Sequence, residues 1–320
     1  TATSSKSKVR GLGAKDLVEG KNTLPIRVIA EDGSEKIYNV NVTRKQAVQN
    51  VSIFGKQFEV VDAEPTLTTS SNNTSDASGL YTSTATNTGE ATYYFRGNVE
   101  NNYVSFAGQT WRIVRINEDG TVRIVMQDGI NSNANIAFNS NYNNYTYMYY
   151  TNSEAKTTLE NWYQANIGSK KDLASSVASG NYYCEQAKVK VSSSYTSGSA
   201  NMTLYSNYAP DFKCNSDGNN KGVVNTSVGL LTYDEVVYAG GYYGQNNSNY
   251  YLNNLAIYWW TMSPAGFSGS RATVWLVNTT GNLNNYFVNN TYRLRPVTSL
   301  KSDTKISNGD GTKENPFTIN

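Results

Sequence analysis

Asp-Gly pairs that separate runs of alternating apolar residues constrain the fold of this 320-residue chain most strongly. Asp32-Gly33 follows the alternating run 24–30, and Asp119-Gly120 follows the run 111–116. A second apolar run comes directly after each pair. Because alternation with a period of two is typical of a half-buried strand, Asp-Gly between two such runs predicts an antiparallel hairpin. We expect one hairpin at each of these places.

Two segments have helical spacing instead. Residues 154–167 follow Ser153, which can cap a helix, and they end at Gly168. Residues 232–239 begin with Thr232 and Glu235 at the spacing of a capping box. Because strands flank these helices without a regular alternation of strand and helix, the predicted fold class is α+β.

The composition excludes several classes of function. Histidine is absent, so hydrolases with a Ser-His-Asp or Cys-His site are excluded, and we expect no catalytic metal and no cofactor. The 27 basic and 25 acidic residues nearly cancel and form no basic cluster, so nucleic acid is not an expected partner. No stretch approaches the ~20 apolar residues of a membrane span, so we expect no membrane insertion within this chain.

The two cysteines, Cys184 and Cys214, lie in polar stretches of the chain. We interpret them as one disulfide, with two free thiols as the alternative. A disulfide is typical of proteins that fold outside the cytoplasm. The chain is therefore interpreted as a mature or excised piece of a secreted protein.

The N-terminal residues carry a first resemblance. Gly20-Lys21-Asn22, Ala30-Glu31-Asp32-Gly33 and Tyr38-Asn39-Val40 make residues 1–48 similar to the C-terminal part of a bacterial cadherin-like β-sandwich repeat. The resemblance implies a β-hairpin remnant of such a sandwich, without its upstream strands. Residues 49–78 end in a run of Thr, Ser and Asn that cannot bury apolar surface, so they are predicted to be a linker.

Residues 79–320 carry a second resemblance, through an ordered series of motifs. The series includes Gly79-Leu80-Tyr81, Tyr94-Phe95-Arg96-Gly97-Asn98, Trp111-Arg112-Ile113-Val114-Arg115-Ile116, Trp260-Thr261-Met262-Ser263-Pro264 and Leu294-Arg295-Pro296-Val297. It resembles a ligand-binding domain of surface proteins of Gram-positive bacteria. The resemblance implies a C-type-lectin-like fold, shared with formylglycine-generating enzymes, in which two helices pack on a twisted antiparallel sheet. The calcium- and sugar-binding motifs of animal lectins are not found, so calcium-dependent sugar binding is not expected.

The segment from 265 to 292 has a further pattern. Apolar residues such as Val274, Val277, Leu283 and Val288 alternate with residues drawn mainly from Asn, Tyr, Ser, Thr and Gly. This pattern resembles the variable proteins of diversity-generating retroelements, although ordinary drift of a polar loop surface leaves the same residue types.

We expect these polar and aromatic residues to form a ligand-binding loop surface. Tyrosine offers a large, stiff contact area, and Asn, Ser and Gly adapt to a partner at little cost. The candidate binding residues are Ala265, Phe267, Ser268, Ser270, Arg271, Asn282, Asn284, Asn285, Tyr286, Phe287, Asn289, Asn290 and Tyr292. Phe267, Arg271, Tyr286, Phe287 and Tyr292 are the expected anchors.

The expected function is non-catalytic, adhesin-like binding of an extracellular protein or glycan. The expected location is secreted or attached to a cell wall of the Gram-positive type. A surface glycosidase needs two suitably placed carboxylates, and a formylglycine-generating type of enzyme needs free thiols at Cys184 and Cys214. These two enzymes, and a structural stalk of the cell surface, are the alternatives.

Overall fold

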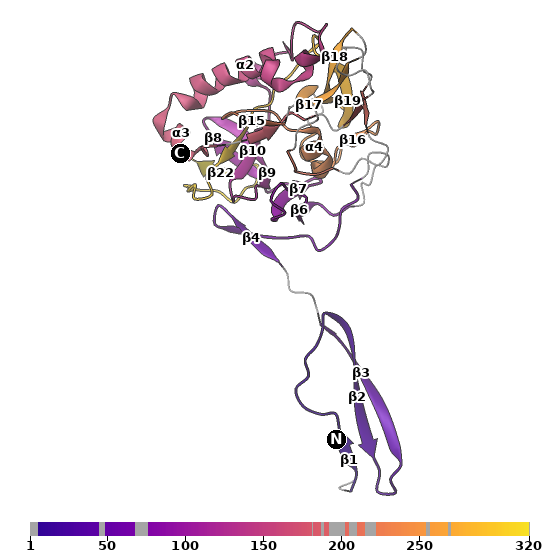
Figure 1. Ribbon diagram of the computed structural model, residues 1–320. Coiled ribbons are helices and arrows are strands. Elements are labelled where there is room, and N and C mark those ends of the chain that lie inside the picture. Colours follow the sequence, from indigo (N-terminus) through magenta and orange to yellow (C-terminus); the bar gives the residue numbers. More distant parts are fainter. Residues whose placement is uncertain are drawn as a thin grey trace. The chain divides into compact units, whose positions relative to one another are not determined.

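The computed structural model divides the chain into two compact units, Thr1–Gln49 and Asn50–Asn320, which we describe separately (Figure 1). The residues that it describes are 6–44, 49–67, 76–180, 182–186, 189–191, 202–204, 210–214, 222–253, 257–267 and 270–319.

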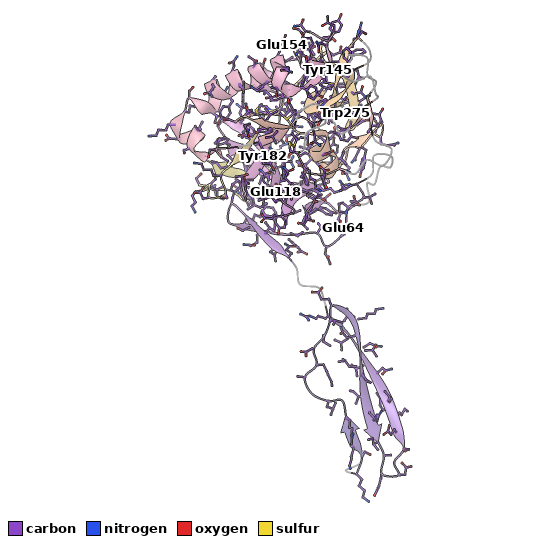
Figure 2. The ribbon with its side chains drawn as sticks, viewed as in Figure 1. Glu64, Glu118, Tyr145, Glu154, Tyr182 and Trp275 are labelled. Atoms are coloured by element: carbon purple, nitrogen blue, oxygen red, sulfur yellow. A yellow bond between two sulfur atoms is a disulfide. The ribbon has the colours of Figure 1, made fainter. Side chains whose placement is uncertain are left out.

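The first unit is a three-stranded antiparallel sheet of β1 (Lys8–Arg10), β2 (Gly20–Ile29) and β3 (Glu35–Arg44), in that order. The predicted hairpin is confirmed, because β2 and β3 pair along their whole length around Gly33, whose φ of 84° suits glycine. Burial alternates along β2, but side chains of the sheet extend outward on both sides (Figure 2). Many stay exposed, including Ile37 at 56%.

The second unit is built mainly from short strands. They are β4 (Asn50–Ile53), β5 (Lys56–Glu59), β6 (Gly79–Ser83), β7 (Thr92–Arg96), β8 (Tyr103–Phe106), β9 (Gln109–Ile116), β10 (Val122–Met126), β11 (Ile136–Ala137), β12 (Tyr182–Cys184), β13 (Val189–Val191), β14 (Met202–Leu204), β15 (Val223–Asn225), β16 (Tyr242–Tyr243), β17 (Trp259–Phe267), β18 (Ala272–Val277), β19 (Asn282–Phe287), β20 (Thr291–Tyr292), β21 (Val297–Leu300) and β22 (Phe317–Ile319).

Two larger sheets organise these strands. A seven-stranded sheet has the order β21-β10-β9-β7-β6, with β8 paired to β9 and β22 paired to β8. A four-stranded sheet has the order β16-β19-β18-β17, and two-stranded sheets join β4 to β5, β11 to β20, β12 to β15 and β13 to β14. The predicted hairpin at Asp119-Gly120 is confirmed, since it connects β9 and β10.

The helices are short. They are α1 (Ile130–Asn133), α2 (Glu154–Tyr163), α3 (Lys171–Ser176) and α4 (Tyr233–Ala239), together with the 3-10 turns η1 (Tyr145–Met148) and η2 (Tyr150–Asn152) and the π-helical segment η3 (Gln164–Gly168).

Two helices lie where the sequence predicted them. Ser153 caps α2 by accepting a hydrogen bond from the backbone N–H of Lys156. The capping box of Thr232 and Glu235 opens α4, and Gly240 follows its last residue. Between the two larger sheets, α4 contacts β7 and β17 (Figure 1).

The predicted α+β fold class is nevertheless wrong. Strands make up 40% of the structure and helices 15%, so the described chain is mostly β, with several separate sheets. The C-type-lectin-like arrangement of two helices on one twisted antiparallel sheet is not what these residues form. The β8–β22 and β16–β19 pairs are also parallel. The Asp-Gly turns and the helix caps predicted where hairpins and helices form. They did not predict which short strands pair with one another across long stretches of sequence.

A large hydrophobic core runs through the second unit, beside a smaller cluster of buried aromatic residues that includes Tyr94 and Tyr238. It includes Trp111, Trp260 and Leu294, none of which exposes as much as 1% of its surface. Ile53 and Phe58 of the β4–β5 hairpin are also buried in this core. Residues 50–59 therefore belong to the second unit, and not to the linker that the sequence predicted for 49–78.

Cys184 and Cys214 form a disulfide, as predicted, with their Cα atoms 5.3 Å apart. The bond links β12 to the segment that contains Cys214. The backbone N–H of Cys214 also donates a hydrogen bond to Asn87 Oδ1. A disulfide is typical of proteins that fold in an oxidising, extracellular compartment. In the described part of the chain, no helix is both long and apolar enough to cross a membrane.

Removal of this disulfide is expected to destabilise the second unit. The cysteines are 30 residues apart, and in the chain-entropy model removing a cross-link that closes a loop of that size costs about 3.6 kcal/mol. The double variant Cys184→Ser, Cys214→Ser should show this loss in chemical denaturation. Thiol titration of the denatured, unreduced wild type should find no free thiol, and detection of two thiols would contradict the bond.

Candidate functional site

The candidate binding residues lie on and around the four-stranded sheet. Residues 272–277 and 282–287 pair in antiparallel register as β18 and β19, with Val274 opposite Tyr286 and Thr273 opposite Phe287. The apolar residues that were expected to be buried, Val274, Val277, Leu283 and Val288, are all 0% exposed. A hairpin on a packed sheet therefore carries much of the site, and not a set of loops.

Three tyrosines form one cluster at this sheet, which we call the tyrosine patch: Tyr258, Tyr286 and Tyr292. The ring of Tyr292 stacks on that of Tyr258 with centroids 5.3 Å apart. Tyr286 meets Tyr292 edge-on at 5.6 Å and Tyr258 at 6.5 Å. The buried ring of Trp260 contacts Tyr292 at 5.0 Å and supports the patch from the core side.

The patch keeps both apolar and polar surface accessible. Its three rings are only partly buried. Within the described residues, the hydroxyl groups of Tyr258 and Tyr286 make no intramolecular hydrogen bond, whereas Asn290 donates weakly to the hydroxyl of Tyr292 at 3.4 Å. Burial raises the pKa of Tyr292, so its hydroxyl stays protonated at neutral pH. The patch can thus offer ring faces and phenolic hydroxyls together.

Phe287 points to the other face of β19, because neighbouring residues of a strand alternate between faces. The exposed guanidinium of Arg271 lies 4.8 Å from the centroid of Phe287 and 5.4 Å from that of Tyr142. This second aromatic group is therefore distinct from the tyrosine patch, although Tyr286 and Phe287 are adjacent in sequence.

The remaining candidate residues divide by burial. Ala265 and Phe267 are each 4% exposed, so Phe267 is a core residue and the expectation that it anchors a ligand is wrong. The reason is that β17 continues to Phe267 and pairs it with Ala272, so this stretch is not a loop. Ser268 lies outside the described residues. The accessible or partly buried remainder comprises Ser270, Asn282, Asn284, Asn285, Asn289 and Asn290.

Two residues of these aromatic groups were not predicted from the sequence. Tyr258 contacts Tyr286 and Tyr292, and Tyr142 lies next to Arg271. Tyr258 precedes the Trp259-Trp260 pair, and its position next to two strand tryptophans was the available signal. Tyr142 comes from a tyrosine-rich stretch more than a hundred residues earlier. Nothing in the local pattern places it near Arg271.

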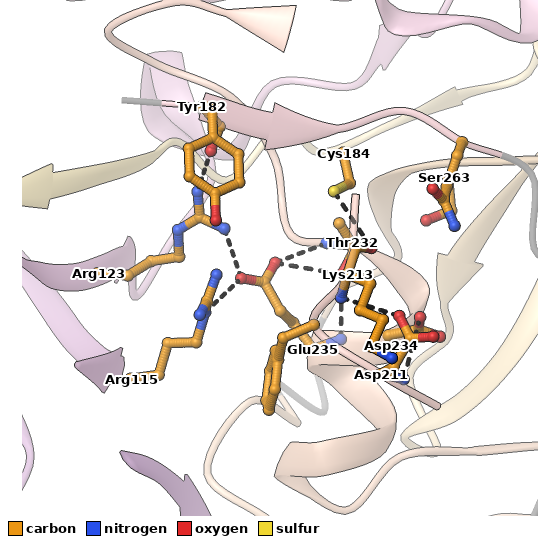
Figure 3. A pocket seen from close by; sticks show the side chains of 12 residues that line it. Arg115, Arg123, Tyr182, Cys184, Asp211, Lys213, Thr232, Asp234, Glu235 and Ser263 are labelled. Atoms are coloured by element: carbon orange, nitrogen blue, oxygen red, sulfur yellow. Dashed lines mark hydrogen bonds and ion pairs between the residues drawn. The ribbon is translucent and has the colours of Figure 1, made fainter. Parts of the chain in front are cut away.

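A different pocket lies beside the charged core of the second unit (Figure 3). Its lining includes Arg115, Arg123, Asp234 and Glu235. The cavity volume is about 20 Å³, which is room for one water molecule, whereas small-molecule sites have ~300–1,000 Å³. We therefore assign this pocket a structural role.

The electrostatics of Glu235 agree with that role. Its Oε1 accepts from Arg123 at 2.6 Å and from Arg115 at 3.3 Å, and its Oε2 accepts from the backbone N–H of Thr232 at 2.9 Å. Burial by itself raises the pKa of Glu235, but Arg123 and Arg115 outweigh burial and hold the pKa below its usual value. A general acid needs a raised pKa instead.

No known protein family matches this chain, and neither does a curated protein or a solved structure.

Proposed function

We propose that this protein is a non-catalytic, extracellular, adhesin-like binding protein that recognises a protein ligand through the tyrosine patch. The observation that carries the proposal is the cluster of Tyr258, Tyr286 and Tyr292, whose rings are partly exposed. Two of its hydroxyls make no hydrogen bond within the part of the chain that the structure describes. Tyrosine and arginine are enriched among the residues that dominate binding energy in protein interfaces.

The neighbouring residues support the same function. The amide side chains of Asn284, Asn285 and Asn289 lie on and beside β19, and amides can donate and accept hydrogen bonds at an interface. Leu283 of β19 and Val288 just after it are both 0% exposed, so the core holds this segment and the patch is presented on a rigid element. Rigid presentation limits the entropy lost on binding.

The alternatives have weaker support. A formylglycine-generating type of enzyme needs free thiols, whereas Cys184 and Cys214 are bonded to each other. A glycosidase needs two carboxylates, one of them with a raised pKa. The buried carboxylate of Glu235 has a lowered pKa and a cavity of water size beside it. The secreted or Gram-positive cell-wall location, and a stalk role for the first unit, remain part of this proposal.

Truncation of the patch is expected to weaken ligand binding without unfolding the protein. The ligand would first be identified on an array of extracellular proteins and glycans, run with and without EDTA. Tyr286→Ala should then cost about 1–3 kcal/mol of binding free energy in a titration of that ligand, which corresponds to roughly 5- to 150-fold in Kd.

Tyr38→Ala is the matched control, since Tyr38 is 49% exposed and lies on β3 of the first unit. It should bind like the wild type. The proposal is overturned if no protein on the array binds, or if Tyr286→Ala and Tyr292→Ala stay folded and retain full affinity.

A further inference from the structure

A second and larger cavity lies apart from the residues of the tyrosine patch, between the end of β10, helix α1 and the α2–η3 segment. Its volume is about 400 Å³, within the ~300–1,000 Å³ range of small-molecule sites. Polar side chains provide most of its lining: Gln109, Asp128, Asn131, Ser132, Asn133 and Asn166, with Trp162 as the aromatic member. We call it the amide cavity.

One wall is a left-handed turn. Asn131, Ser132 and Asn133 have φ angles of 50°, 55° and 64°, a region that costs ordinary L-residues about 1–2 kcal/mol each and asparagine less. The turn is held in place because the backbone N–H of Gly129 donates to Asn133 Oδ1 at 2.6 Å and Arg293 Nε donates to the carbonyl of Asn133 at 3.0 Å. Residues held in such conformations cluster at functional sites.

Another part of the lining contains a second rare conformation. Helix α2 widens directly into the π-helical segment η3, which contributes Asn166 to the lining. Its side-chain amide donates to the carbonyl of Trp162 at 2.8 Å, which leaves its oxygen available. Single π-turns are rare and frequently lie at functional sites. Two independent, uncommon backbone conformations thus direct amide side chains into one cavity.

The lining has the hydrogen-bonding character of a site for hydroxyl groups. Within the described residues, the side chains of Gln109, Asn131 and Ser132 make no intramolecular hydrogen bond. A side-chain amide has both hydrogen-bond donors and an acceptor. A sugar hydroxyl also donates and accepts, so an amide can form hydrogen bonds with it in either direction. A ligand that presents several hydroxyls in a small volume matches this arrangement.

Trp162 supplies an apolar platform beside these polar groups. It is partly buried, and its ring centroid lies 6.3 Å from that of Trp111, which is fully buried in the core. The core thereby holds the indole in position while part of it lines the cavity. A pyranose ring has an apolar face of C–H groups that packs against such an aromatic surface, and its hydroxyls point outward from the ring.

The charge of the lining favours neutral sugars over anionic ones. Asp128 is exposed and lines the cavity, and the described lining residues include no lysine or arginine. Asp128 is therefore the charged side chain of the described lining, and its negative charge disfavours phosphate, sulfate and uronic acids. We infer that the amide cavity binds a neutral saccharide, by direct hydrogen bonds and by stacking on Trp162.

Saccharide binding to purified full-length protein tests this inference. Saturation-transfer NMR with glucose, galactose, mannose, N-acetylglucosamine and N-acetylgalactosamine at roughly 10 mM, above the ~1 mM Kd of a weak site, should detect at least one of them. Glucuronate should bind more weakly than glucose, and EDTA should change nothing, because the described residues contain no cluster of three potential metal ligands.

Asn131→Gly separates recognition from folding. Glycine accepts the left-handed conformation, so the turn is retained while the amide is lost, and we expect saccharide affinity to fall by roughly tenfold. Asn135→Gly, an exposed asparagine outside the lining, is the matched control and should bind normally. Trp162→Ala should weaken binding further.

The inference is overturned if none of the five sugars binds, or if Asn131→Gly and Trp162→Ala bind like the wild type. Loss of saccharide binding in Tyr286→Ala with full retention in Asn131→Gly would also overturn it. Conversely, loss in Asn131→Gly with protein binding intact would separate this site from the tyrosine patch.

Discussion

Glu235→Gln is expected to lower the free energy of unfolding by about 3–5 kcal/mol, as is typical when one partner of a buried ion pair is removed. Glu235 is 2% exposed and pairs with both Arg115 and Arg123, whose side chains are each 4% exposed. The neutral amide would leave these two guanidinium groups close together in the core without their shared counter-charge. Chemical denaturation followed by circular dichroism measures the loss.

Glu160→Gln is the matched control for this change. Glu160 pairs with Lys156 one helical turn away, and its side chain is 40% exposed. Exposed pairs contribute about 0–1 kcal/mol, so this variant should unfold almost like the wild type. Equal effects of the two substitutions would contradict the structural role assigned to the charged core.

The same residue predicts a pH dependence. Because the pKa of Glu235 is lower in the folded than in the unfolded protein, its contribution is complete above the unfolded pKa, near 4.5, and is lost as the pH falls toward the folded pKa. The unfolding free energy of the wild type should therefore decrease below about pH 4.5. In Glu235→Gln this part of the decrease should be absent. A curve of unchanged slope would contradict the assignment.

Leu294→Ala should destabilise the second unit by about 2–5 kcal/mol, the range for deletion of a buried leucine side chain. Leu294 is 0% exposed, and its carbonyl accepts a hydrogen bond from the backbone N–H of Ile130 at 3.0 Å, next to the left-handed turn. Tyr292→Ala, two residues earlier on the tyrosine patch, should cost considerably less. Urea denaturation of the two variants measures the difference.

Leu12→Ala is the control, because Leu12 is 68% exposed and its truncation should change stability by no more than about 0.5 kcal/mol. If Tyr292→Ala were as destabilising as Leu294→Ala, the tyrosine patch would be part of the core and not a binding surface.

The sequence by itself determined the features that depend on interactions within a few residues. The hairpins at Asp32-Gly33 and Asp119-Gly120 formed as expected, because turn chemistry and alternation act locally. The capping box of Thr232 and Glu235 was visible because both partners lie within the first turn of α4. The apolar residues of the C-terminal segment, such as Val274 and Leu283, were also expected to be buried, and both are 0% exposed.

Only the tertiary structure decided how these elements combine. The order of the sheets, and with it the mostly β architecture, depends on pairings between distant strands that period-two alternation does not specify. Phe267 is an aromatic residue in a polar segment and was therefore expected to bind a ligand. The register of β17 with β18 buries it instead. Packing likewise brought Tyr258 to Tyr286 and Tyr292, and Tyr142 to Arg271.

The charged core around Glu235 and the amide cavity also combine local features with contacts that only the tertiary structure makes. Glu235 was recognisable as a helix cap, but its ion pairs reach Arg115 and Arg123, which lie 120 and 112 residues away. The amide cavity gathers Gln109, the turn at 131–133 and Trp162 from three separate segments. Each segment is polar or helical by its own pattern, and only the packing of the whole unit brings their side chains around one space. Local sequence preferences determine the elements, and the burial of apolar surface over the entire chain determines which of them meet.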